Sequence, residues 1–193
     1  MTATAPGSLD HADLTFLALR SGEGDAAATA SFVHRTQRDV WRYCAHVLGT
    51  DAADDAAQAT FLRALPALRN YRGESSAKTW LIGVARHVCL DELRARGRRD
   101  RLLTKLVAQP VDAPPGLEGQ PAELVEAITS LSDDRREAFV LTQVLGFSYE
   151  EAAAAAGCPI GTIRSRVARA RGDLLDHLAA DLEPVEPVVA AVP

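Results

Sequence analysis

Four arginines gather in a segment that holds no acidic residue, from Pro159 to Arg171. A guanidinium donates hydrogen bonds in a fixed fork that matches a phosphate or the edge of a guanine. At 100° per residue, the apolar residues of this segment share one helical face, and they are Ile160, Ile163, Val167, Ala170 and Leu174. Opposite them lie Thr162, Ser165, Ala168 and Arg169, with Arg164, Arg166 and Arg171 at the flanks. The pattern predicts a helix that offers Arg169 to a base and the flanking arginines to phosphates.

The residues before this helix predict a shorter helix and a tight turn. Ser148 and Glu151 form an S-x-x-E capping box, which starts a helix. Gly157 ends that helix, and Pro159 suits the first turn of the next one. A short helix, a turn and a longer helix make the helix-turn-helix arrangement. The alternative interpretation is an amphipathic helix whose charged face is merely solvated.

A second basic stretch, from Arg86 to Lys105, carries seven basic residues against three acidic ones. It follows a loop with Gly73, Ser75 and Ser76, and it begins within a predicted helix that contains Trp80. A small polar loop beside aromatic rings is suited to hold an unstacked base of single-stranded DNA. The predicted core side of this helix comprises Leu81, Ile82, Val84, Ala85, Val88, Cys89 and Leu93, and its other edge carries Gly83, Arg86, His87 and Arg94. The alternative interpretation places Trp80 purely in the core, a role that is compatible with DNA binding by the same segment.

The segment 51–68 predicts a helix with two distinct stripes. The apolar stripe, expected in the core, consists of Ala57, Phe61, Ala64, Leu65 and Leu68. The other stripe consists of Asp51, Asp55, Gln58 and Leu62. An exposed leucine beside acidic and amide side chains suits docking onto a helix of a partner protein.

Composition excludes several other classes of protein. With 193 residues, 47% of them hydrophobic, and a net charge of −5, the chain has room for one medium domain or two small ones. Its longest apolar run is too short to span a membrane, and its N-terminus lacks the features of a secretory signal. Three widely spaced cysteines fit a reducing cytoplasm. Scattered histidines, an isolated Cys44 and His46, and no phosphate-binding glycine loop predict no catalytic residue, no metal, no cofactor and no enzymatic activity.

Proline placement and helix-forming composition predict an all-α chain with two small helical domains joined by a flexible linker. The expected helices span about 10–20, 25–48, 51–68, 77–96, 122–130, 133–145, 149–156 and 160–180. The expected segments are a disordered N-terminus (1–8), a first domain (9–100), a Pro/Gly-rich linker (101–121), a helix-turn-helix domain (122–182) and a disordered tail (183–193).

Several motifs together resemble one known family. The segments DDAAQATFLRAL, YRGESSAKTWL and ARHVCLDELR resemble region 2 of bacterial sigma factors. The segment LSDDRREAFVLTQVLGFSYEEAAAAAGCPIGTIRSRVARAR resembles region 4, and the order and short linker resemble the extracytoplasmic-function (ECF) group. Region 3 is replaced by the linker, as is usual in that group. Two positions depart from the family pattern: Ala59 stands where Glu usually follows the Gln, which implies weaker polymerase docking, and His87 stands where Asn is common, which leaves the −10 preference open.

The resemblance implies a role for each of three residue sets. Docking on the coiled coil of the polymerase β′ subunit falls to Asp54, Asp55, Gln58, Phe61 and Leu62, with Phe61 also expected to pack in the core. Reading the −10 element and holding the opened strand falls to Ser75, Ser76, Lys78, Thr79, Trp80, Arg86 and His87. Reading the −35 element falls to Thr162, Arg164, Ser165, Arg166 and Arg169.

Complementary charge predicts that the free protein hides its DNA-binding surfaces. Two basic segments coexist with an acidic C-terminal stretch and an acidic start of the helix at residues 51–55. Either the chain's own domains or a bound anti-sigma factor is expected to cover these surfaces. The expected partners are core RNA polymerase and promoter DNA, such a factor is a further candidate, and no membrane contact of the chain's own is expected. The alternatives are a stand-alone helix-turn-helix regulator, which binds DNA without polymerase, and an adaptor that uses the acidic helix without touching DNA.

Overall fold

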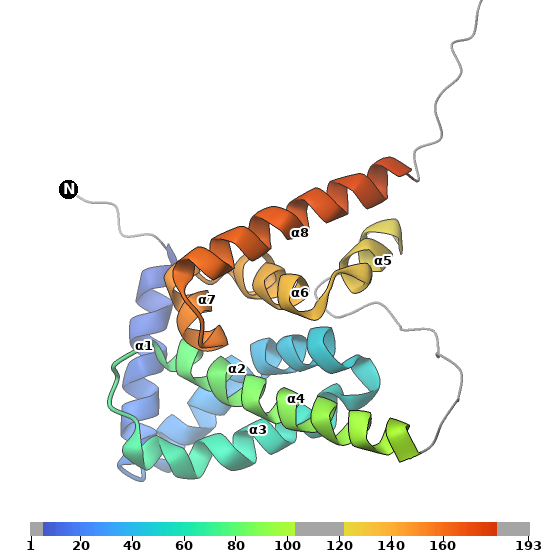
Figure 1. Ribbon diagram of the computed structural model, residues 1–193. Coiled ribbons are helices and arrows are strands. Elements are labelled where there is room, and N and C mark those ends of the chain that lie inside the picture. Colours follow the sequence, from blue (N-terminus) through green and yellow to red (C-terminus); the bar gives the residue numbers. More distant parts are fainter. Residues whose placement is uncertain (1–5, 103–121, 181–193) are drawn as a thin grey trace, which may run out of the picture.

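The computed structural model describes residues 6–102 and 122–180, and within them every regular element is a helix. The first domain consists of α1 (Pro6–Gly22), α2 (Ala26–Leu48), α3 (Ala53–Ala67) and α4 (Ala77–Leu102). The second consists of α5 (Ala122–Ser130), α6 (Asp133–Phe139), α7 (Tyr149–Ala156) and α8 (Ile160–Ala180). Figure 1 shows the two groups of helices stacked on each other, with α8 across the top of the second. The prediction of an all-α fold with two small domains is confirmed.

Some predicted segments fall partly or wholly outside the described residues. The linker predicted at 101–121 lies outside them, apart from the end of α4, and so does the tail predicted at 183–193. Helix α1 begins at Pro6 and so includes residues 6–8, which were assigned to the N-terminal segment. None of the helices within the described ranges is both long and apolar enough to cross a lipid bilayer.

Local hydrogen bonds explain where α2 begins and ends. The carboxylate of Asp25 accepts a hydrogen bond of 3.0 Å from the backbone amide of Ala28, which satisfies a donor of the first turn. That bond, together with the nearby guanidinium of Arg20, lowers the pKa of Asp25. Gly49, with φ of 86°, ends the helix in a backbone conformation that few other residues adopt. These two signals set the length of the helix that runs through the first domain.

The apolar stripe predicted for α3 is only partly correct. Ala64 and Leu68 are buried, whereas Ala57, Phe61 and Leu65 are half-buried. The face that packs against the core consists of small residues, namely Ala53, Ala56, Thr60 and Ala64. Thr60 can lie there because its hydroxyl donates a hydrogen bond of 2.7 Å to the carbonyl of Ala56. The helical spacing of apolar residues predicts the stripe, whereas close packing between helices favours small residues at the contact.

The helix expected at 133–145 changes its winding after Phe139. Residues Val140–Val144 are wound as a π-helix, in which the amide of Leu145 bonds the carbonyl of Val140 at 3.0 Å. Gly146, with φ of 71°, then turns the chain toward α7. Such widened turns are rare and frequently occur at functional sites. Here the turn lies at the boundary with the first domain.

The apolar face predicted for α8 is confirmed. Ile163, Val167, Ala170 and Leu174 are buried, and only Ile160, at the first turn, is half-buried. Ala170 and Leu174 pack in a small cluster with Ala127 and Ile128 of α5 and with Leu131, which follows α5. Ile163 and Val167 belong to the main core. The outer face of α8 is therefore left to its polar side chains.

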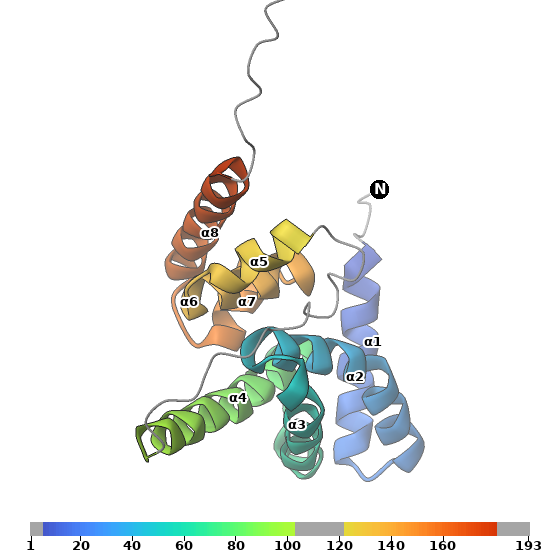
Figure 2. The same cartoon turned by 90° about the vertical axis from the view of Figure 1, so that its right-hand side faces the viewer.

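One apolar core runs through both domains. It contains Leu81 and Ile82 of α4 together with Ala152, Ala155 and other alanines of α7. Helices α4 and α7 pack directly on each other. Figure 2, a view from another side, shows the second domain above α2 and α4 of the first. Gly83 lies at this contact, and a Cβ there would stand 3.9 Å from the carbonyl oxygen of Ala155, which is an ordinary van der Waals distance. The free chain is thus closed, with its domains in contact.

Candidate nucleic-acid interface

The two helices of the helix-turn-helix are held by the predicted capping box. The amide of Glu151 donates to Ser148 Oγ at 3.1 Å, and the amide of Ser148 donates to Glu151 Oε2 at 3.0 Å. Gly157 ends α7 in the left-handed conformation, with φ of 63° and ψ of 37°. The amide of Thr162 then bonds the carbonyl of Pro159 at 2.9 Å, which starts α8. The capping box and turn expected from the sequence are confirmed.

We predict that Ser148→Ala lowers the free energy of unfolding by about 1 kcal/mol, because the mutation removes one bond of the capping box. Ser132→Ala is a matched control, since Ser132 precedes α6 but makes no side-chain capping bond. Chemical denaturation of the two variants measures the difference. Equal losses for both variants would show that the box contributes nothing beyond a generic serine at a helix start.

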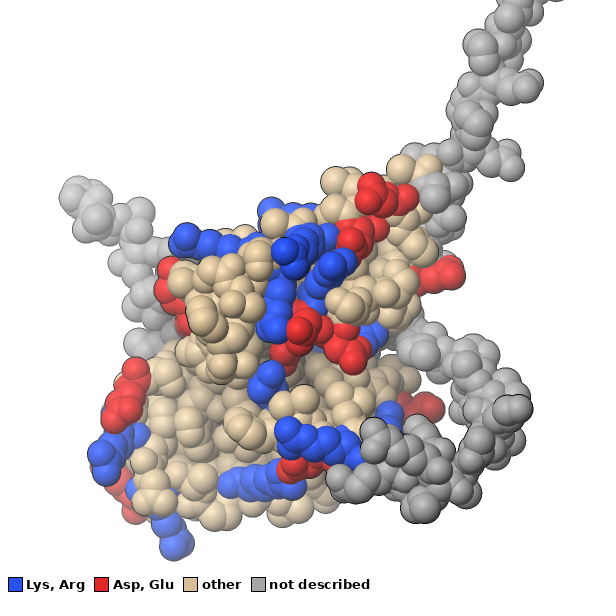
Figure 3. Space-filling model, viewed as in Figure 1, with Lys and Arg blue, Asp and Glu red and all other residues tan. Residues whose placement is uncertain are grey.

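The outer face of α8 presents arginines to solvent. Arg164 and Arg169 are exposed and make no hydrogen bond or ion pair with any residue that the structure describes. Arg166 is half-buried and bonds Asp134 Oδ2 at 2.6 Å. Arg171 donates to Gln143 Oε1 at 3.1 Å. Figure 3 shows basic side chains gathered over α8, above a mixed belt of acidic and basic ones.

The two short polar residues predicted on this face are also on the outside of α8. Ser165 is exposed, and its hydroxyl donates to the carbonyl of Thr162 at 2.9 Å. Thr162 is half-buried in the first turn of the helix. With Arg164 and Arg169 they form a surface of short polar side chains between two long cationic ones. Such a surface can enter a DNA groove and donate to both bases and phosphates.

The loop before α4 gives two predicted DNA contacts a structural role. Ser76 caps α4, because its Oγ accepts a hydrogen bond of 3.1 Å from the amide of Thr79. The hydroxyls of the same two residues lie 2.8 Å apart, and Thr79 is only 3% exposed. Ser76 Oγ also reaches Glu151 Oε1 of the second domain at 3.5 Å. In this closed form neither side chain is presented to a ligand.

A pocket beside the same loop is open to solvent. Its walls include Trp80 and Tyr71, whose ring centroids lie 5.2 Å apart with the planes tilted by 45°. The Tyr71 hydroxyl donates to the carbonyl of Ser75 at 2.5 Å, and burial raises the pKa of this tyrosine. The pocket volume, about 390 Å³, falls in the range of sites that hold small molecules. The full lining is Asn70, Tyr71, Arg72, Glu74, Ser75 and Trp80.

Lys78 of α4 is engaged by the second domain. Its Nζ forms an ion pair of 2.7 Å with Asp39 and donates to the carbonyl of Leu145 at 3.2 Å. The same atom lies 5.4 Å from the ring centroid of Phe147, a cation–π arrangement. The Lys78 side chain is only 15% exposed. The π-helical turn thus ends where a carbonyl meets this lysine.

Arg86 takes part in a second contact between the domains, which we call the Glu137 latch (Tyr43, Arg86 and Glu137). Glu137 Oε1 accepts a hydrogen bond from the Tyr43 hydroxyl at 2.6 Å and another from Arg86 Nε at 2.9 Å. The Glu137 side chain is 13% exposed. Burial, and then the negative charge of Glu137, raise the pKa of Tyr43 well above its ordinary value. The latch joins α2 and α4 to α6.

His87 differs from the other residues predicted to bind the −10 element, because it is exposed on α4. Its Nδ1 lies 2.7 Å from the carbonyl oxygen of Gly83. The structure therefore divides the predicted −10 set in three. Ser75 and Trp80 line the pocket, and His87 is exposed on the surface. The rest are covered or bonded: Ser76, Lys78 and Arg86 contact the second domain, and Thr79 is buried beside Ser76.

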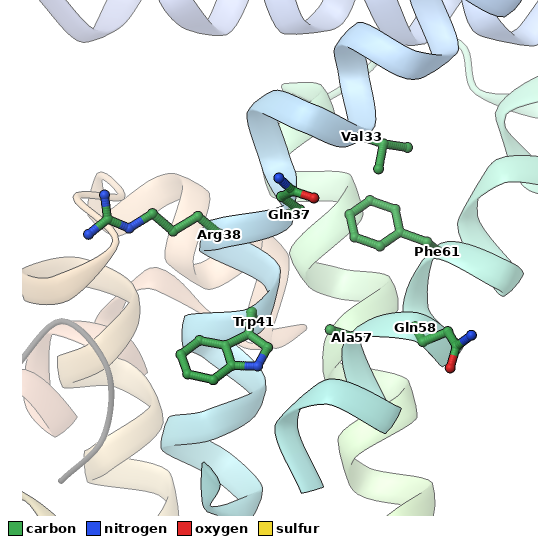
Figure 4. Close-up of a pocket in the computed structure, with 7 residues that line it drawn as sticks. All are labelled: Val33, Gln37, Arg38, Trp41, Ala57, Gln58 and Phe61. Atoms are coloured by element: carbon green, nitrogen blue, oxygen red, sulfur yellow. The ribbon is translucent and has the colours of Figure 1, made fainter. Parts of the chain in front are cut away.

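A groove between α2 and α3 lies on another side of the first domain. The docking groove, with a volume of about 450 Å³, is lined by Val33, Gln37, Arg38, Trp41, Ala57, Gln58 and Phe61 (Figure 4). Of the residues predicted to bind polymerase, Gln58 and Phe61 line it. Asp54 accepts a hydrogen bond of 2.7 Å from Trp41 Nε1, and Asp55 is exposed. Leu62, the fifth, is 69% exposed on α3.

The α2 wall of the docking groove was missed by reasoning from the sequence. Val33, Gln37 and Trp41 follow each other at four-residue spacing and so share one face of α2. That spacing could have indicated a common face, but their partners on α3 lie far along the chain. Figure 4 shows the Phe61 ring between the two helices, with the Val33 side chain across the groove from it.

Two family models and several known proteins match this chain. The family model of sigma-70 region 2 matches residues 32–99, and the family model of sigma-70 region 4 matches residues 122–174. The chain is 46% identical to the probable RNA polymerase sigma-C factor of Mycobacterium bovis, over 95% of this chain and 97% of that protein. It is 32% identical to the ECF RNA polymerase sigma-E factor of Escherichia coli, over 79% of this chain and 87% of that protein.

Two solved structures resemble the fold. One is the sigma factor RpoE of Bartonella quintana in complex with the anti-sigma factor NepR, with a TM-score of 0.71 and 31% identity over 79% of this chain and 98% of that one. The other is CnrH in complex with the cytosolic domain of CnrY, with a TM-score of 0.67 and 24% identity over 88% of this chain and 99% of that one. The chain belongs to the ECF group of the sigma-70 family, the RNA polymerase sigma factors.

Proposed function

We propose that this sigma factor docks core polymerase with the α2–α3 groove, reads the −10 element with α4 and its preceding loop, and reads the −35 element with α8. The observation that carries the proposal is the division of α8. Its apolar face is buried, whereas Arg164 and Arg169 project into solvent without a partner among the described residues. A helix with this division, preceded by a short capped helix and a glycine turn, is suited to lie in the major groove.

The assignment within α8 separates base contact from phosphate contact. Arg169 lies opposite the buried face, so it points most directly at a groove floor. Arg171 lies at the flank and bonds Gln143, a position from which it can reach a phosphate. A good bidentate base contact contributes about 1–3 kcal/mol of discrimination, whereas a phosphate contact contributes affinity without sequence preference.

We therefore predict that Arg169→Ala relaxes the choice of −35 sequence by the polymerase complex by about 1–3 kcal/mol at one base pair. Binding to promoter variants, each changed at one −35 position, measures this loss. Arg171→Ala is the matched control, for which we expect a uniform loss over all variants and a weaker dependence on salt. The same uniform loss for Arg169→Ala would refute the assignment of Arg169 to a base.

Once the two domains have separated, the pocket beside Trp80 is the proposed site for a base flipped out of the −10 element. Its aromatic wall can stack on a base, and its polar residues can bond the base edge. Lys78 and Arg86 would then contact the backbone of the opened strand. Both side chains are engaged by the second domain in the free chain, so reading of the −10 element requires that the domains separate.

We propose that contact between its own domains keeps the free chain inactive. Three of the seven residues proposed for the −10 element contact the second domain at that boundary, namely Ser76, Lys78 and Arg86. A separate anti-sigma factor, such as the one bound to the Bartonella quintana relative, is the other proposed means. Binding of the purified protein to promoter DNA distinguishes them, because weak binding in the absence of any other protein requires the intramolecular contact.

A further inference from the structure

Two of the three cysteines lie side by side in the core of the first domain. Cys44 is on α2 and Cys89 is on α4, and both are fully buried. The Cys89 thiol donates to the Cys44 sulfur, with the two Sγ atoms 3.8 Å apart. Disulfide sulfurs are about 2.05 Å apart, so a closing movement of about 1.8 Å would bring these two within bonding distance.

The environment of the pair favours Cys44 as the residue that reacts first. The hydrogen bond from Cys89 lowers the pKa of the Cys44 thiol, and burial only partly offsets this shift. The same hydrogen bond and burial raise the pKa of Cys89. Because the thiolate is the nucleophile in thiol chemistry, the proton leaves Cys44 while Cys89 remains a thiol beside it.

We propose that Cys44 and Cys89 are a redox-active pair that forms a disulfide between α2 and α4 when oxidised by a peroxide. In the first step the Cys44 sulfur attacks one peroxide oxygen, so that an S–O bond forms, the O–O bond breaks and water leaves with the Cys44 proton. In the second step the Cys89 sulfur attacks the Cys44 sulfur, so that the S–S bond forms, the S–O bond breaks and a second water leaves with the Cys89 proton. Two thiols and one peroxide thus give one disulfide and two waters.

The disulfide would link two helices that have different proposed roles. Helix α2 carries one wall of the docking groove, and α4 carries Lys78 and Arg86. The cysteines lie 45 positions apart, so a bond between them removes much of the freedom of the unfolded chain. The oxidised first domain should therefore unfold at a higher temperature than the reduced one.

The test uses the full-length Cys158→Ala variant, in which Cys44 and Cys89 are the only cysteines. The folded protein is treated with hydrogen peroxide, then denatured without reductant, and its free thiols and intact mass are measured. We expect both thiols to disappear, the mass of the monomer to fall by two hydrogen atoms, and dithiothreitol to reverse both changes. Thiols that stay free in the folded protein, while they oxidise in the urea-unfolded protein, would overturn the proposal.

Two further measurements test the pairing itself. Adding Cys89→Ala to the same background should abolish the loss of two hydrogens, and a disulfide-linked dimer in place of the intramolecular bond would contradict the proposal. Oxidation should raise the thermal midpoint of the Cys158→Ala variant by at least about 5 °C. An unchanged or lower midpoint would show that no stabilising disulfide forms between α2 and α4.

Discussion

Replacing Glu137 by alanine should raise the affinity of the free protein for promoter DNA by at least about tenfold. One oxygen of this carboxylate accepts hydrogen bonds from both Tyr43 and Arg86 across the domain boundary. Hydrogen bonds to charged groups contribute about 1.5–3 kcal/mol each, and their loss leaves Arg86 without its partner in the closed state. Every 1.4 kcal/mol shifts the equilibrium between closed and open forms by about tenfold. Because Glu137 is outside the residues proposed to contact DNA, the open form should bind normally.

Fluorescence anisotropy with a labelled promoter fragment, in the absence of polymerase, measures this effect. Asp133→Asn is the matched control, because Asp133 is also on α6 but pairs with Arg136 of its own domain and is 83% exposed. We expect the control to bind like the unmodified protein. Equal affinities for all three proteins would show that the Glu137 latch does not restrain DNA binding.

Replacing Leu62 by arginine should weaken binding to core polymerase by at least about tenfold. Leu62 is 69% exposed on α3, four residues after Gln58 of the docking groove, so the change should leave the fold intact. A buried apolar anchor at a protein interface commonly contributes 2 kcal/mol or more, and a charge in its place adds a desolvation cost. Phe16→Arg is a suitable control, because Phe16 is a similarly exposed apolar residue on α1, at 61%.

Titration of labelled sigma factor with purified core enzyme gives both dissociation constants. The Leu62→Arg variant should keep the wild-type thermal midpoint and, when combined with Glu137→Ala, the same affinity for DNA as Glu137→Ala alone. If Leu62→Arg and Phe16→Arg weakened polymerase binding equally, Leu62 could not be an anchor of the principal docking surface.

The helices and the helix-turn-helix could be predicted because their signals are local. The capping box of Ser148 and Glu151 and the glycine at position 157 each act within one turn of chain. The buried face of α8 follows from helical periodicity alone. Contacts between elements have no such local signal. The packing of α4 on α7, the α2 wall of the docking groove and the small-residue face of α3 all depend on partners far along the chain.

The residues predicted to bind the −10 element show the same limit. Polar residues before a helix serve equally well as ligand contacts and as caps, and Ser76 is a cap in the closed form. A lysine or arginine on a helix edge predicts an anionic partner without identifying it. For Lys78 and Arg86 the partners in the free chain are Asp39 and Glu137, and DNA is the proposed partner after opening.

Reconstituted transcription tests the central claim most directly. Core RNA polymerase, free of other sigma factors, is combined with this protein and a library of promoter fragments, and run-off transcripts are mapped to their start sites. The account predicts new initiation at a defined set of promoters, strictly dependent on the protein and lost at those promoters when Leu62 is replaced by arginine. Sequence-specific DNA binding without polymerase, together with no initiation by the combined enzyme on any promoter, would contradict it.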